Sequence, residues 1–154
     1  MAHSSIGTHP SHGHTKIVSL SSAEQLGSRD SGLVFMCTHS SAFTVNLPKL
    51  STEIAGWQAR FITKASGADM HIMAWGLTSA GGTGDSGVTN DGDTVILKEM
   101  ATTDAGAATA TSQDGVILKS GATAGDSIDI FTDGTNWYAT SLVADAAHSD
   151  DIDG

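Results

Sequence analysis

Cysteine, proline, aromatic residues and basic residues are all scarce in this chain of 154 residues. The single cysteine excludes a disulfide within the chain, and the position of Cys37 in the apolar run LVFMC predicts a small, inert core residue. Seven Lys and Arg against 17 Asp and Glu give a formal net charge of −10. This balance argues against binding nucleic acid through its phosphates and against docking on an anionic membrane.

Long apolar runs are missing as well. No segment reaches the ~20 apolar residues of a membrane-spanning helix. The first residues, MAHSSIGTHPSHGHTK, contain no apolar run, so we do not expect a secretory signal there.

Charged residues make up 16% of the chain, below the roughly 25% that is typical of soluble domains. Glycine (18 residues) and long stretches of Ala, Ser and Thr take their place. Exposed helices are normally coated with Lys, Glu and Arg, so few helices are expected. The fold class predicted is all-β: a single β-sandwich, jelly roll or barrel-like domain with an extended N-terminal arm.

The strands are predicted from short apolar or alternating segments bounded by turn residues. LVFMC is a continuous apolar run, which suits a strand covered on both faces. SSAEQLGS (21–28) is expected to form a loop or one helical turn, and the small-residue stretches 77–93 and 100–115 are expected to be loops. The expected strands are residues 16–20, 33–37, 42–48, 56–64, 69–75, 94–98, 116–119, 126–132 and 135–143.

Three parts of the chain differ in composition. Residues 1–15 are polar and contain four His, which predicts a flexible arm. Residues 16–143 hold the predicted strands and form the β domain. Residues 144–154 read as an acidic C-terminal tail, since ADAAHSDDIDG carries four Asp and no Lys or Arg.

The last two strands form the clearest local prediction. Asp133-Gly134 is expected to make a two-residue type I′ turn between them. Trp137 and Tyr138 follow in sequence, so they point to opposite faces of the sheet. We expect one to face the core and the other a neighbouring chain or sheet. Trp57 and Trp75 are the further candidates for core or interface residues.

Two patterns in the 77–93 loop are suggestive of chemistry. GTGDSG (82–87) contains the Gly-Asp-Ser-Gly of chymotrypsin-like proteases, but Val88 stands where that pattern has Gly, and no segment supplies the partner His. Asp85, Asn90, Asp91 and Asp93 carry oxygens of the kind that Ca²⁺ binds, without the order of a calcium loop. A Gly-rich loop with Asx turns explains both, and no catalytic residue is predicted.

The N-terminal arm holds a possible metal site. His12 and His14 are two positions apart, so in an extended strand both imidazoles lie on the same side, and His9 is close by. A polar, His-rich arm without metal is the reading we favour, so no metal and no cofactor are expected.

Four segments together resemble a known class of protein. They are SAFTVNLPKL (41–50), GWQARFITKAS (56–66), MHIMAWG (70–76) and GDSIDIFTDGTNWYATSL (125–142). A strand ending in Leu-Pro, then a Gly-Trp strand, then G-D-x-I-x-I-x-x-D-G-T-x-W-Y resembles the surface β domains of tailed-bacteriophage structural proteins. The resemblance covers about residues 30–143. It implies a non-enzymatic virion protein that is usually homotrimeric.

Within that class, the chain is most similar to a capsid decoration, or cement, protein. The sequence contains no shaft repeats or coiled coil of the kind found in fibres. The resemblance implies a homotrimer made in the host cytoplasm that binds the major capsid protein on the outer head surface and stabilises the shell. Residues 1–20 would reach onto the capsid or an adjacent copy.

Other functions remain open from the sequence. A fibre or spike tip could bind a receptor through the 77–93 loop, with Trp75 as a stacking platform for a glycan. A small secreted or cellular β-sandwich binding module and an enzyme are the remaining alternatives.

Overall fold

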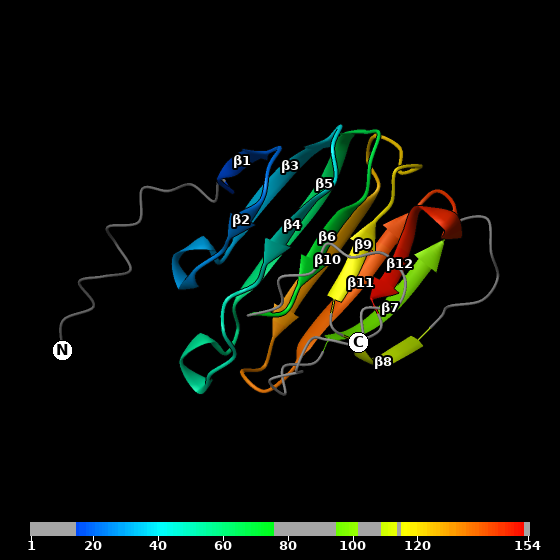
Figure 1. Ribbon diagram of the computed structural model, residues 1–154. Coiled ribbons are helices and arrows are strands. Elements are labelled where there is room, and N and C mark those ends of the chain that lie inside the picture. Colours follow the sequence, from blue (N-terminus) through cyan, green and yellow to red (C-terminus); the bar gives the residue numbers. More distant parts are fainter. Residues whose placement is uncertain (1–14, 76–94, 102–108, 114, 153–154) are drawn as a thin grey trace.

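The computed structural model describes residues 15–75, 95–101, 109–113 and 115–152, and these residues form two β-sheets (Figure 1). The helical elements among them are single 3₁₀ turns: η1 (Ser28–Asp30), η2 (Thr52–Ile54) and η3 (Ala146–His148). The all-β prediction is therefore confirmed.

The larger sheet, here called sheet A, has seven strands in the order β1-β3-β5-β10-β11-β7-β8. β1, β3 and β5 run parallel to one another, as do β11 and β7, and the remaining pairs are antiparallel. Their bounds are β1 Ile17–Leu20, β3 Leu33–His39, β5 Gln58–Ser66, β10 Ser127–Thr132, β11 Trp137–Val143, β7 Val95–Ala101 and β8 Thr109–Gln113.

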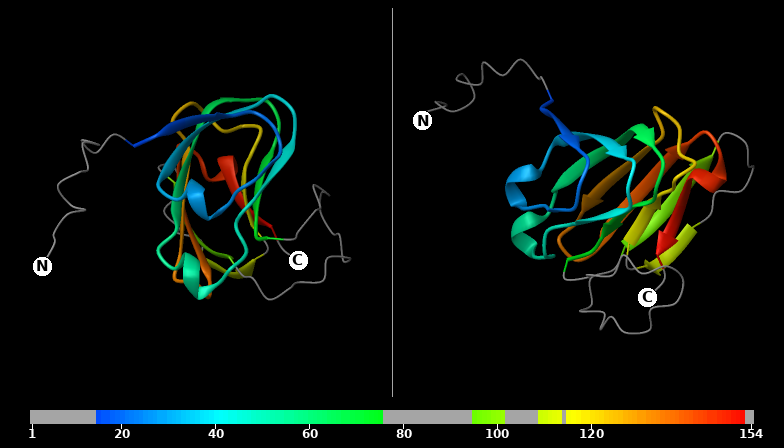
Figure 2. Two further views of the ribbon diagram at one scale, coloured as in Figure 1. Left: turned by 90° about the vertical axis from the view of Figure 1, so that its left-hand side faces the viewer. Right: turned by 45° about the horizontal axis from the view of Figure 1, so that its top comes forward.

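Sheet B has five strands in the order β12-β9-β6-β4-β2 and lies against one face of sheet A, as Figure 2 shows edge-on. β2, β4 and β6 are parallel, whereas β6, β9 and β12 are antiparallel. The bounds are β12 Ser149–Ile152, β9 Gly115–Leu118, β6 Met70–Met73, β4 Phe43–Asn46 and β2 Glu24–Gln25. The two layers make a β-sandwich.

The core lies between the sheets and is built from alternate residues of the strands. Two aromatic contacts anchor it: Trp57 meets Trp137 edge-on with 5.2 Å between ring centroids, and Phe35 stacks on Phe61 at 5.0 Å. Sheet B contributes fully buried aliphatic side chains, namely Val45, Met70, Ile72, Val116 and Leu118. Four of the seven Trp and Phe residues of the chain therefore take part in these two contacts.

Three segments differ from their prediction. Residues 21–28 were expected to be a loop or helical turn, but Glu24–Gln25 pairs with β4, and the 3₁₀ turn begins only at Ser28. The 100–115 stretch contains strand β8, and the acidic tail contains η3 and strand β12. All three are short strands whose backbone pairing, rather than apolar alternation, holds them in place.

The turn between β10 and β11 is also longer than predicted. Thr132 pairs with Trp137, so four residues, 133–136, connect the strands rather than two. The Asp133 carboxylate accepts hydrogen bonds from the backbone N–H groups of Thr135 and Asn136, both at 2.8 Å. The Asp side chain thus organises the turn, in which Gly134 has a positive φ of 93°.

Candidate interaction surface

The β10–β11 hairpin places its two neighbouring aromatics on opposite sides of sheet A. Trp137 is fully buried between the sheets, where it contacts Trp57, itself 3% exposed. The Trp57 indole N–H donates to the Gly27 carbonyl at 3.0 Å, whereas the Trp137 indole N–H is buried without a hydrogen-bond partner. Tyr138 lies on the other side, which faces away from sheet B.

That side of sheet A, here called the outer face, carries most of the exposed apolar bulk among the described residues. Ile17, Phe131 and Leu142 are 65%, 49% and 55% exposed. The strand register places them in rows with further apolar side chains of intermediate exposure, namely Val34, Met36, Ile62 and Tyr138. Exposed apolar groups on one continuous sheet face mark an interaction surface.

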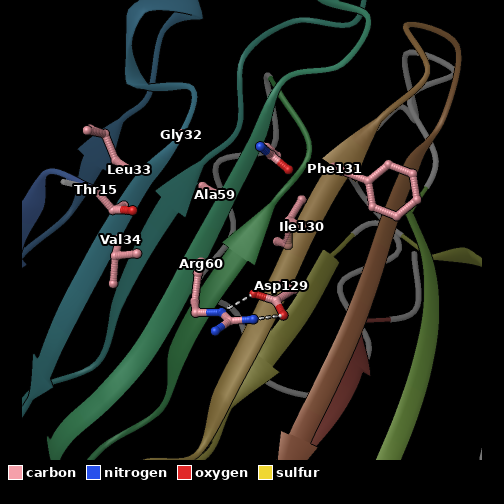
Figure 3. A pocket seen from close by; sticks show the side chains of 10 residues that line it. Thr15, Gly32, Leu33, Val34, Ala59, Arg60, Asp129, Ile130 and Phe131 are labelled. Carbon is pink, nitrogen blue, oxygen red and sulfur yellow. Dashed lines mark hydrogen bonds and ion pairs between the residues drawn. The ribbon is translucent and has the colours of Figure 1, made fainter. Parts of the chain in front are cut away.

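An ion pair occupies the middle of the outer face. Arg60 on β5 and Asp129 on β10 are opposite each other in the strand register. Two hydrogen bonds join them, Nε to Oδ1 and Nη2 to Oδ2, each 2.5 Å long (Figure 3). The Asp129 carboxylate raises the pKa of Arg60, so the guanidinium stays charged. Each charge is satisfied by the other, which leaves the centre of the face electrically balanced.

A shallow groove of about 410 Å³ runs beside this pair. It is lined by residues of β3, β5 and β10 together with Thr15 and Gly32, and Phe131 forms one wall (Figure 3). Its two charged side chains, Arg60 and Asp129, are already bonded to each other. The groove therefore offers shape and apolar contact rather than an unpaired charge.

An aromatic pair lies on the same face next to the turn. Phe131 and Tyr138 stack with 5.0 Å between ring centroids and 16° between ring planes. The Tyr138 hydroxyl donates to the Asp133 carboxylate at 2.9 Å. Backbone N–H groups of Asn136 and Thr135, and then this hydroxyl, lower the pKa of Asp133. The same bond raises the pKa of Tyr138, so the phenol stays neutral and donates at physiological pH.

The fourth exposed large hydrophobic residue, Trp75, lies elsewhere. It is 38% exposed in the turn that follows β6 of sheet B, and the Lys49 ammonium lies 4.8 Å from its ring centroid. Of the four aromatic candidates from the sequence, Trp57 and Trp137 are thus core residues and Tyr138 is on the outer face of sheet A. Trp75 is in neither the core nor the outer face, because it lies in the turn after β6.

The polar and titratable groups inside the domain that are described next do not form a reactive or metal-binding cluster. Burial raises the pKa of the Cys37 thiol to about 12, which leaves it protonated and unreactive. The buried Asp126 pairs with the partly exposed His148, whose Nδ1 is 2.7 Å from Asp126 Oδ2. Within the described ranges no three His, Cys, Asp or Glu side chains gather as metal ligands. The candidates His9, His12 and His14, the GTGDSG motif and the loop acids lie outside the described residues.

The alternation of GWQARFITK already places Arg60 opposite the core residues Trp57, Ala59 and Phe61, but Asp129, Phe131 and Leu142 were not predicted as surface residues. Strand alternation could have indicated them. Leu142 is four residues after Tyr138 on β11, and Phe131 is two residues after Asp129 on β10, so each pair lies on one face of its strand. The partner strands of β10 could not be read from the chain, because β5 is more than 60 residues away in sequence.

In the part of the chain that the structure describes, no helix is long and apolar enough to cross a membrane. Comparison with protein-family models, with curated proteins and with solved structures finds no match.

Proposed function

We propose that this chain is a non-enzymatic capsid decoration protein of a tailed bacteriophage. In this proposal it binds the major capsid protein on the outer head surface as a homotrimer and stabilises the shell. The observation that carries the proposal is the outer face of sheet A, which presents large apolar side chains to solvent around a balanced ion pair. A protein whose function is to make interfaces needs such a surface and needs no catalytic constellation.

The segments that resemble phage surface domains support the same proposal. They correspond to β4, β5, β6 and the β10–β11 hairpin, which supply the two anchoring tryptophans and the centre of the outer face. The pattern therefore coincides with the structural framework of the sandwich and with the exposed surface that it carries.

The number and position of copies in purified virions test this function. Quantitative gels with labelled-antibody imaging should find hundreds of copies on the head. Particles that lack the protein should break open at lower temperature or lower salt than complete ones. A location on the tail, or intact stability without the protein, would contradict capsid decoration.

A receptor-binding fibre or spike domain is the second candidate, and Trp75 favours it. An exposed indole beside an ammonium group is a surface on which a sugar ring can stack. This function predicts a handful of copies on the tail, and loss of host attachment in Trp75→Ala. Attachment that is unchanged in this variant would exclude Trp75 from receptor binding.

A further inference from the structure

We propose that the outer face of sheet A is the surface through which copies of this chain bind one another. The inference deepens the proposed function and rests on its assembly into an oligomer, since it names the contact that holds the copies together. The occupant of the face is therefore a second copy of this chain rather than a small ligand or the capsid.

One strand of sheet A, β3, is apolar on both sides. In β3, the run Leu33–Cys37 sends Phe35 and Cys37 into the core and leaves Val34 and Met36 on the outer face. β10 and β11 alternate instead, and each adds one large exposed apolar side chain to the outer face, Phe131 and Leu142. Strands that are apolar on both sides are typical of sheets covered on both sides, and sheet B covers only one.

Charge favours a second copy as the cover. The chain carries a net charge of −10, so most of its surface repels another copy. The described side chains of the outer face and its rim are balanced instead, with Arg60 and Lys64 against Asp129 and Asp133. Two such faces can meet without like-charge repulsion, whereas a strongly charged partner would gain nothing from them.

The size of the face fits a stable self-contact. Seven strands spaced ~4.8 Å apart, each about six residues long at ~3.3 Å per residue, give a face of roughly 700 Å². A standard stable interface buries about 800 Å² per partner, so one copy of this face approaches the area needed. The two charges beside the groove are already paired with each other, which disfavours a dedicated charged ligand there.

Sedimentation equilibrium of the full chain and of three variants tests the inference. The wild type is expected to sediment with a mass at least twice the 15.7 kDa of one chain. Leu142→Asp puts a carboxylate on an exposed position of the face and should weaken association at least tenfold. Trp75→Asp is the control, because it also puts a carboxylate in place of an exposed apolar side chain, but outside the face, and its association should not change. Leu142→Thr keeps a strand-forming residue and provides a milder second variant, expected to weaken association to a smaller extent.

Circular dichroism and thermal unfolding of each variant establish that it is folded. A wild type that stays at the mass of one chain at all concentrations would overturn the inference, as would Leu142→Asp and Leu142→Thr variants that associate normally. A face-dependent dimer would support the inference but contradict the homotrimer. Virion copy number remains a separate measurement, so decoration of the capsid can stand or fall independently of this contact.

Discussion

Among single substitutions, we expect truncation of Trp137 to lower the stability of the domain most. This side chain is fully buried and packs edge-on against Trp57 in a core with few other large groups. Trp137→Ala should lower the free energy of unfolding by ~3–5 kcal/mol, measured by denaturant unfolding. Trp137→Phe should cost much less, because it keeps most of the ring and removes an indole N–H that has no partner.

Trp75→Ala is the control for this pair of variants. Its indole is 38% exposed and contacts Lys49, so its loss should cost below about 1 kcal/mol. A Trp137→Ala cost of that same size would contradict the position of Trp137 in the core.

Asp126 should give the domain a pH-dependent stability. Burial by itself raises the pKa of this carboxyl, but hydrogen bonds from Thr123, Ala144 and His148 outweigh burial and hold the pKa below its usual value. A lowered folded-state pKa stabilises the fold above the ordinary carboxyl pKa, and this contribution is lost as the pH falls through the folded-state value. Stability should therefore decline below about pH 4.

Asp126→Asn isolates this contribution. At pH 7 the variant should be less stable by ~1–3 kcal/mol, because a neutral amide cannot accept all of these bonds. The difference from wild type should shrink as denaturant unfolding is repeated from pH 7 down to pH 2. Glu53→Gln, at an exposed carboxyl, should differ by less than ~0.5 kcal/mol at neutral pH. A constant difference between Asp126→Asn and wild type across the pH range would argue against the linkage.

The β10–β11 hairpin depends on one glycine. Gly134 has φ of 93°, and a Cβ added there would lie 3.0 Å from the Ser51 carbonyl oxygen and 3.2 Å from Thr52 Cα. Gly134→Ala should therefore cost about 1–3 kcal/mol in thermal or denaturant unfolding. Gly27→Ala is the matched control, since Gly27 has φ of −121° and its added Cβ would meet nothing closer than 3.8 Å. Equal stability losses in the two variants would show that the turn is not constrained.

The sequence predicts those strands that show clear apolar alternation or an apolar run and misses those that show neither. Strands such as β5 and β11 alternate clearly and contain a large aromatic in or next to them, so their positions were predicted to within a few residues. β2, β8 and β12 consist of EQ, TATSQ and SDDI, which carry no apolar alternation. They are strands because a neighbouring strand offers unpaired backbone groups, and that neighbour is distant in sequence.

The same limit applies to the hairpin turn and to the outer face. Asp-Gly was read as a two-residue turn, but the Asp133 side chain bonds two backbone N–H groups and supports a four-residue connection instead. The opposite directions of Trp137 and Tyr138 follow from strand geometry alone. The exposed row that includes Phe131 and Leu142 depends on strand order, which local sequence does not encode.

The surface of the molecule has two kinds of region, a strongly acidic part and the charge-balanced outer face of sheet A. Its acidic excess keeps copies apart in most orientations, while the outer face of sheet A is both apolar and charge-balanced. Under the proposed self-contact, such orientation-specific association would favour a defined oligomer over aggregation. The sequence predicts an interface because one of Trp137 and Tyr138 must face away from the core. The structure adds that the uncovered side of sheet A (Figure 2) is the one that carries Tyr138.

Removal of residues 1–14 tests whether the β domain is independent of the N-terminal segment. The first described core residue is Leu20, and the two anchoring aromatic contacts come from β3, β5 and β11 together with Trp57. The truncated chain should therefore unfold within about 0.5 kcal/mol of the full chain, since every core residue that the structure describes is kept. Under the proposed function, binding of the truncated chain to capsids should weaken, because the segment would supply contacts to the shell. Co-sedimentation with capsids that lack the protein measures this, and unchanged binding would exclude the segment from the capsid contact.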